Sequence, residues 1–226
     1  MAFPAPTPRR PPAKAGFVHR PEPHLDSTYA GGLSIPVVRT ARLTMCGLGE
    51  AHLDDFTRIQ HDHRVAEWFG GLPDPLPSPQ EQREDTWRVI ATFLGHWALR
   101  GYGQWALVRT SDGRFVGRAG LWNPEGWPGV EVGWLVDPQL WGQGYASEAG
   151  RAAVDVAFDR LHLDEVISVT VPHNARSRRV MEKVGLTDTG TTVELRGHTQ
   201  VRYRITRDEW LAQPRDPQPQ EDTTSA

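Results

Sequence analysis

The stretch from Glu131 to Ala149 constrains the fold of this chain more than any other, and it reads EVGWLVDPQLWGQGYASEA. This pattern predicts a strand, a turn at Asp137-Pro138, a loop that contains Gly142 and Gly144, and the start of a helix. Glycine lets the backbone come close to a bulky ligand because no Cβ intervenes. The N–H groups and the positive dipole end at a helix start favour an anion such as a phosphate. An ordinary strand-to-helix turn would show the same glycines, so this motif alone leaves both interpretations open.

A second segment, from Pro172 to Leu186, reads PHNARSRRVMEKVGL. Together the two segments resemble the GNAT N-acetyltransferase superfamily, especially its branch of enzymes similar to ribosomal-protein-alanine acetyltransferases. The family's pyrophosphate loop falls on residues 141–146, and its Asn-x-x-Ser motif falls on Asn174 and Ser177. The resemblance extends from about residue 40 to about residue 210. It departs from the family pattern at Trp141, where the loop usually begins with Arg or Gln.

The resemblance implies that acetyl-CoA is the cosubstrate. We expect no metal, because the only candidate ligand pair, His61 and His63, has the wrong spacing for one site. The pyrophosphate would accept hydrogen bonds from the backbone of the glycine loop, and pantetheine would pair like an extra strand with residues 134–136. The implied cofactor contacts are Trp134, Leu135, Val136, Trp141, Gly142, Gln143, Gly144, Tyr145, Ala146, Ser147, Asn174 and Ser177. Ser147 and Asn174 also suit helix N-termini, where their side chains would bond to the backbone.

Acyl transfer to an amine requires a base for the nucleophile and a proton for the departing thiolate. Some relatives use a Glu and a Tyr, but this chain has Val169 and Met181 at the matching positions. Glu131, on the central strand, is the best remaining candidate for the base. The alternative is a carboxylate that lies at the end of the sheet or contacts the substrate. Ser177 is the candidate proton donor, with a surface hydroxyl as the alternative.

Aromatic side chains mark the expected acceptor side. The candidates for substrate binding are Trp68, Phe69, Trp122, Glu125 and Trp127, because aromatic faces and a carboxylate can receive a cationic amine. The subfamily suggests a protein N-terminal α-amine as the acceptor, and a small-molecule amine remains open. The pair His61 and His63 suggests a metal at first, but a spacing of two places the rings on different faces of a helix.

The composition narrows the class of protein. The chain has 226 residues, a formal net charge of -3 and one cysteine, Cys46. A charge of this size gives no reason to expect nucleic acid or a membrane surface as a partner. A single cysteine suits a reducing cytoplasm. We expect one GNAT domain over residues 38–212, between a proline-rich disordered extension (1–37) and a disordered tail (213–226), as a monomer or homodimer.

The resemblance implies a GNAT fold, an α/β (α+β) arrangement with a mixed, mostly antiparallel sheet. We expect roughly six to seven strands, a splayed central parallel pair and about four helices. Hydrophobic patterns place strands at 42–45, 104–109, 115–122, 130–136, 165–171, 191–195 and 200–205, and helices at 50–61, from 78 onward, at 146–161 and at 174–184. Trp87, Trp97 and Trp105 are expected in the core.

Three functions compete at this point. An acetyl-CoA-dependent N-acetyltransferase leads, and a catalytically silent acyl-CoA-binding module on the same fold comes second because the Glu and the Tyr are missing. A dinucleotide-binding oxidoreductase comes last, because the loop lacks a third glycine and follows a late strand rather than the first one.

Overall fold

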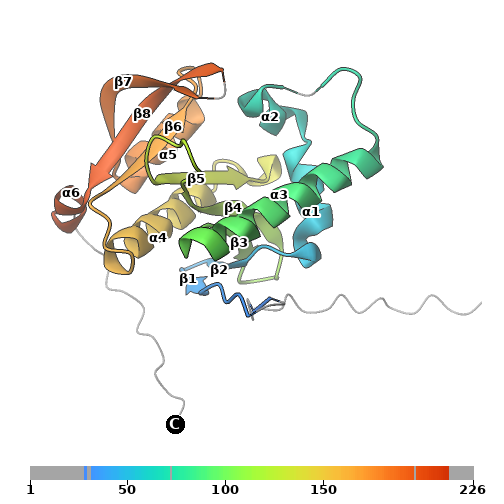
Figure 1. The fold of residues 1–226 in the computed structure, drawn as a ribbon, viewed down its shortest axis with the longest axis horizontal. Coiled ribbons are helices and arrows are strands. Elements are labelled where there is room, and N and C mark those ends of the chain that lie inside the picture. Colours follow the sequence, from blue (N-terminus) through green and yellow to red (C-terminus); the bar gives the residue numbers. More distant parts are fainter. Residues whose placement is uncertain (1–27, 30–31, 72, 196, 214–226) are drawn as a thin grey trace, which may run out of the picture.

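The computed structural model describes residues 28–29, 32–71, 73–195 and 197–213, which form one eight-stranded sheet with helices on both faces (Figure 1). In spatial order the strands are β1 (Val38–Arg39), β2 (Leu43–Gly47), β3 (Gln104–Arg109), β4 (Phe115–Trp122), β5 (Glu131–Val136), β6 (Glu165–Thr170), β8 (His198–Thr206) and β7 (Thr187–Leu195). Only β5 and β6 run parallel, and every other neighbouring pair is antiparallel. This confirms the expected mixed sheet with one parallel pair.

Six α-helices accompany the sheet within the described residues. They are α1 (Leu53–Gln60), α2 (His63–Ala66), α3 (Pro79–Arg100), α4 (Tyr145–Asp159), α5 (Ala175–Val184) and α6 (Arg207–Leu211), with short 3₁₀ turns at η1 (Glu50–His52), η2 (Glu67–Phe69) and η3 (Pro138–Leu140). The expectation was roughly six to seven strands and about four helices. The additional elements are short, namely the two-residue β1 and the helices α2 and α6.

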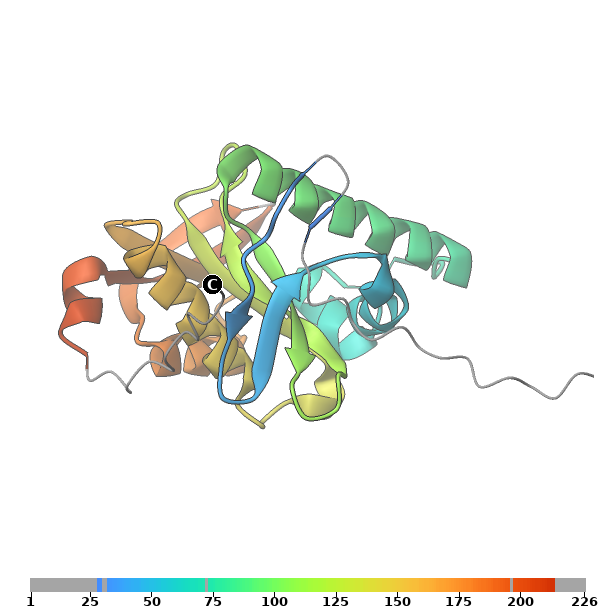
Figure 2. The same cartoon turned by 90° about the horizontal axis from the view of Figure 1, so that it is seen from below.

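The two faces of the sheet are covered by different helices because side chains alternate along each strand. Cys46, Ala106 and Val108 pack with α1 and α3 on one face. Their neighbours Met45 and Leu107 pack with α4 on the other face. Figure 2, seen from below, shows α3 and α4 separated by the strands.

Helix α3 begins where its sequence predicts. The Ser78 side chain accepts a hydrogen bond from Glu81 N, and the Glu81 side chain bonds back to Ser78 N, which completes a capping box. The buried residues of its inner face include Thr86, Ile90 and Phe93. Trp87 lies one position away from this stripe, is 48% exposed and donates to Glu50 Oε1 at 3.1 Å. The prediction of a core Trp87 was therefore wrong.

Residues before position 38, where we expect the domain to begin, also pack against it. Ile35 is only 2% exposed, and Trp105 Nε1 donates to Pro36 O at 2.9 Å. The Tyr29 hydroxyl donates to Leu48 O at 2.5 Å. The folded part therefore begins before β1. Residues 1–27 and 214–226, where we expected disorder, lie outside the described residues.

The described residues contain no helix that is long and apolar enough to cross a membrane.

Candidate active site

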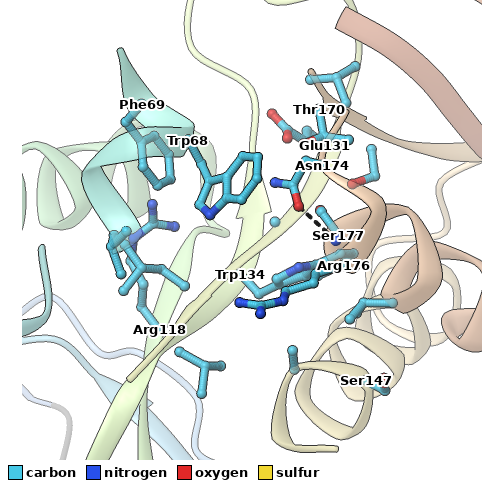
Figure 3. Close-up of a pocket in the computed structure, with 18 of the residues that line it drawn as sticks. Trp68, Phe69, Arg118, Glu131, Trp134, Ser147, Thr170, Asn174, Arg176 and Ser177 are labelled. Carbon is cyan, nitrogen blue, oxygen red and sulfur yellow. Dashed lines mark hydrogen bonds between the residues drawn. The ribbon is translucent and has the colours of Figure 1, made fainter. Parts of the chain in front are cut away.

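The parallel strands β5 and β6 diverge soon after they meet. Their ladder has one aligned residue pair, Glu131 opposite Ile167, and Ile167 N donates to Val130 O at 2.9 Å. Beyond this pair the buried Ser168 hydroxyl donates to Val132 O at 2.8 Å, so a side chain continues the link for one more residue. A cavity of about 830 Å³ opens at this divergence. Residues from both faces of the sheet line it (Figure 3).

The glycine loop forms one wall of the cavity. Gly142 and Gly144 have φ angles of +80° and +86°, the left-handed region that a residue with a Cβ adopts only with strain. Gly144 is the N-cap of α4, and no side chain of the described residues caps this helix start. The cavity lining includes Tyr145, Ala146 and Ser147 of the first turn. Their N–H groups precede the first intrahelical bonds, so this end of α4 suits an anion.

A buried carboxylate supports the strand-to-loop junction from behind. Asp137 is fully buried and accepts hydrogen bonds from Arg58 Nη2 at 2.7 Å, Arg114 Nη2 at 2.9 Å and Gln139 N at 2.9 Å. Burial raises the pKa of Asp137, but the hydrogen bonds from Arg58, Gln139 and Arg114 outweigh it and hold the pKa below its usual value. The carboxylate therefore joins α1, the turn before β4 and η3.

A third arginine, Arg42, fixes the loop from the outside. Arg42 donates to Gln143 O at 2.9 Å and to Glu148 Oε2 at 2.7 Å, and its guanidinium carbon lies 4.7 Å from the centre of the Tyr145 ring. Gln143, a predicted cofactor contact, is exposed and is not part of the cavity lining, whereas its neighbours Gly142 and Gly144 are.

Helix α5 adds positive charge that the sequence reasoning missed. Arg176, Arg179 and Lys183 all line the cavity, and the spacing of three and four residues places them on one face of the helix. The Arg176 guanidinium lies 4.7 Å from the centre of the Trp141 ring, a cation–π contact. Trp141 Nε1 donates to Val136 O at 2.8 Å. The tryptophan thus stands at the position where the family usually has Arg or Gln, with a guanidinium stacked on it. The spacing of three and four residues between these basic residues was the signal in the sequence that could have predicted a positively charged face.

The two polar residues at the start of α5 also face the cavity. Asn174 is the N-cap of α5, and its Oδ1 accepts from Ser177 N at 3.0 Å (Figure 3). Both residues belong to the lining, as does Val169 on β6. Met181, at the position where some relatives have a Tyr, is fully buried in the core. Its thioether carries no ionisable hydrogen, so this position cannot supply a proton.

Glu131 lies at the beginning of β5 and faces the cavity. Trp127 Nε1 donates to Glu131 Oε2 at 2.7 Å, which orients the carboxylate. The other oxygen, Oε1, lies 3.7 Å from the point where a Cβ on Gly133 would stand. The carboxylate therefore borders open space above a glycine of its own strand.

The aromatic side chains of the expected acceptor side do line the cavity, namely Trp68, Phe69, Trp122 and Trp127. Trp68 lies 5.6 Å from His173, ring centre to ring centre, and Phe69 is 60% exposed. Glu125 lies elsewhere. Its side chain is fully exposed, and its carboxylate is 3.7 Å from Arg100.

His96 holds Trp122 and the loop that follows β4. Its ring stacks on Trp122 at 4.5 Å, its Nδ1 lies 2.8 Å from Tyr102 O, and its Nε2 accepts from Asn123 N at 3.0 Å. Burial lowers the pKa of His96, so the ring is neutral at pH 7, with its proton on Nδ1.

Two polar residues on the α3 face were not predicted. Arg118, in the middle of β4, and the buried Gln104 on β3 both line the cavity. Arg118 Nη1 donates to Gln104 Oε1 at 2.8 Å. An arginine inside an otherwise apolar strand, FVGRAGLW, was the signal in the sequence.

The chain matches the family described as "Acetyltransferase (GNAT) domain" over residues 42–187. It is 34% identical over 194 residues to the "FsC-acetyl coenzyme A-N(2)-transacetylase" of Aspergillus fumigatus, an alignment that covers 78% of each protein. Among solved structures it is similar to an acetyltransferase from Agrobacterium tumefaciens, with a TM-score of 0.65, 30% identity, and coverage of 76% of this chain and 95% of that one.

A likeness in fold alone extends to a spermidine N-acetyltransferase from Vibrio cholerae whose structure contains CoA and spermine. The TM-score is 0.59 at 16% identity, and the alignment covers 76% of this chain and 99% of that one.

Proposed function

Because this chain belongs to the GNAT acetyltransferase family, we propose that it moves an acetyl group from acetyl-CoA to a primary amine by direct attack in a ternary complex. The observation that carries the proposal is that the uncapped start of α4 and the Glu131 carboxylate open onto the same cavity. The first suits the phosphates of a nucleotide cosubstrate, and the second suits an amine.

The residues around the glycine loop fit coenzyme A. The N–H groups of Tyr145 to Ser147 would bind the pyrophosphate, since helix N-termini favour anions. Arg176, Arg179 and Lys183 would add charge-assisted contacts to phosphate oxygens. The aromatic ring of Trp141 holds Arg176 in place and provides a flat surface beside the loop.

Acetyl-CoA supplies the acetyl group as a thioester, from which the amine nitrogen displaces the thiol. A backbone N–H on β5 would stabilise the negative charge that develops on the carbonyl oxygen, and one such donor is typically worth about 10²–10³ in rate. Glu131, oriented by Trp127, would take the proton that the amine loses. Ser177 would give a proton to the departing sulfur.

The acceptor class follows from the strength of the base. Deprotonating an α-amine of pKa about 7.8 at neutral pH costs roughly 1 kcal/mol, whereas a lysine of pKa about 10.4 costs roughly 4.6 kcal/mol. Glu131 already accepts a hydrogen bond from Trp127, which makes its carboxylate a weaker base. Such a base suits an amine of low pKa. We propose a protein N-terminal α-amine or a small-molecule amine. We also propose the cytoplasm as the compartment, on the basis of the single cysteine.

The test is thiol release from acetyl-CoA with a panel of peptides and small amines. Glu131→Gln should lower the rate at neutral pH by about 10²–10⁴ with little change in acetyl-CoA affinity. The loss should shrink as the pH rises through the pKa of the acceptor, because the amine then arrives neutral. Glu84→Gln, an exposed carboxylate on α3, is the matched control and should leave the rate unchanged.

The second candidate is an acyl-CoA-binding module without turnover. The observation in its favour is Met181, buried where some relatives have a Tyr, together with Val169 in place of the Glu. It predicts tight acetyl-CoA binding and no thiol release with any amine.

Parallel pH–rate profiles of wild type and Glu131→Gln, less than threefold apart, would remove Glu131 from the mechanism and leave the transferase proposal intact.

A further inference from the structure

The guanidinium of Arg118 is held in a fixed position at the α3 end of the cavity. It donates to Gln104 Oε1 at 2.8 Å, and its carbon lies 4.9 Å from the centre of the Phe93 ring. Gln104 is only 1% exposed, so the hydrogen-bonding partner is itself immobilised by burial. Arg118, Gln104 and Phe93 all belong to the cavity lining. Figure 3 shows Arg118 on the same side of the pocket as Trp68 and Phe69, across from Asn174 and Ser177.

This arginine is separate from the positive charge on α5. Arg118 lies cross-strand from Leu135, on the face of the sheet that packs with α1 and α3. The basic residues of α5 lie on the side of the glycine loop, where Arg176 stacks on Trp141. The phosphates of the cosubstrate would therefore contact the basic residues of α5. An anion bound at Arg118 would then belong to the other reactant.

The register places Glu131 and Arg118 at two ends of one open stretch. Glu131 lies on β5 opposite Trp122, and Arg118 lies on β4 opposite Leu135. The position on β5 that faces Arg118 is therefore four residues beyond Glu131. Four residues of strand span roughly 13 Å. Between them lies Gly133, and a Cβ there would meet only Glu131 Oε1 within 4 Å among the described residues. Among the described residues, no other side chain thus lies within 4 Å of this point between the carboxylate and the guanidinium.

We propose that the acceptor is an amine that also carries a carboxylate, bound with its nitrogen at Glu131 and its carboxylate at Arg118. This rests on the transferase function proposed above. A guanidinium matches the planar geometry of a carboxylate and can bind it through two parallel hydrogen bonds. The carboxylate takes no part in the reaction. The nitrogen forms the new bond to the acetyl carbon, the bond from that carbon to sulfur breaks, and the amine proton leaves through Glu131.

The test compares three matched series of acceptors in the wild-type protein. They are ω-amino acids of increasing chain length from glycine upward, the corresponding ω-amino amides, and plain alkylamines. We expect kcat/KM for the best amino acid to exceed that of its amide by tenfold or more. The chain length at the optimum reports the separation between the two binding points. Equal kcat/KM for acid and amide at every length overturns the proposal and leaves Arg118 a residue that supports the sheet.

Arg118→Met then tests the residue itself. In a variant that remains folded by thermal denaturation, the preference for the acid over the amide should fall to less than threefold, while alkylamine kcat/KM and acetyl-CoA affinity stay within threefold of wild type. Arg118→Lys should restore part of the preference, because it keeps the charge but not the planar fork. Arg88→Met, which removes an exposed arginine on α3, is the matched control.

The outcomes separate the two proposals. A preference that persists in Arg118→Met, or a loss of acetyl-CoA affinity measured by calorimetry, overturns the carboxylate site alone. Absence of thiol release with all three series in every protein contradicts the transferase function, and the carboxylate site with it.

Discussion

At the scale of single residues, two glycines offer a controlled comparison. Gly142 and Gly126 have φ angles of +80° and +79°, and a Cβ on either would meet no atom of the described residues within 4 Å. An alanine at either site suffers the same backbone strain, about 1–2 kcal/mol. Only Gly142 lines the cavity. The two positions therefore separate backbone strain from the close approach of a ligand.

We expect Gly142→Ala and Gly126→Ala to lose similar stability, and only Gly142→Ala to lose acetyl-CoA affinity, by about tenfold or more, equivalent to about 1.4 kcal/mol. Thermal denaturation measures the first effect and calorimetry the second. Unchanged affinity in a folded Gly142→Ala protein would remove the glycine loop from the cofactor site.

Some residue roles were predictable because they depend on local backbone chemistry. Asn174 as an N-cap follows from a side-chain oxygen near the start of a helix, and its bond to Ser177 N confirms it. Arg118 was not predicted, because its role depends on Gln104 and Phe93, which lie far away in the sequence. Gln143 and Glu125 lie outside the cavity lining because Arg42 binds the loop at Gln143 O and solvent surrounds Glu125.

At the scale of elements, the strands of one hairpin, β3 and β4, were predicted with correct bounds. Their turn residues and alternating side chains are adjacent in the sequence. The start of β7, residues 187–190, was missed, because this segment is polar and mostly exposed, and only the pairing of β7 with β8 makes it part of a strand. Trp87 was misplaced because a shift of one residue in a helix rotates a side chain by about 100°.

The junction of β5 and η3 should make stability depend on acid pH through Asp137. The pKa of Asp137 is depressed, so its contribution is complete above the unfolded value of about 3.9 and is lost as the pH falls through the folded value. Asp137→Asn should lower the free energy of unfolding at pH 7 by about 2 kcal/mol. The variant should also flatten the fall in stability below pH about 4.

Asp112→Asn serves as the control for that prediction, measured by urea denaturation across the same pH range. Asp112 pairs with Arg109 in an exposed turn, where solvent screens the interaction, so its loss should matter far less. An Asp137→Asn protein with the stability and acid profile of wild type would show that the two arginines need no buried partner.

At the scale of the whole molecule, a direct transfer predicts that no acetyl group becomes attached to the protein. Cys46 is the single cysteine, it is 1% exposed, and burial raises its pKa to about 11, so at pH 7 it is a neutral thiol. We expect intersecting lines in double-reciprocal plots when both reactants are varied. Mass spectrometry after incubation with acetyl-CoA alone should find the unmodified chain. Parallel lines, or a protein that carries one acetyl group which an amine then removes, would instead indicate a covalent intermediate.

The global arrangement was predictable only through the family resemblance. Hydrophobic patterns indicate that a crossover helix joins two parallel strands, but they do not show where the strands part. That point depends on the ladder ending after Glu131 and Ile167 and on the Ser168 hydroxyl that follows. Likewise, the packing of Ile35 against the core depends on contacts that the proline-rich composition of the N-terminal region conceals.

The cavity is lined by residues from both faces of the sheet, and this has a consequence for inhibitor design. A molecule that joins an amine to coenzyme A through a short linker would pass through the opening between β5 and β6. Its amine half would lie among Trp122 and Trp127, and its coenzyme half would lie beside Gly142. Tethering converts the second binding event into an intramolecular one, so affinity would depend on linker length and fall steeply once the tether is too short to span the opening. The length of the best linker would then report the distance through the opening between β5 and β6.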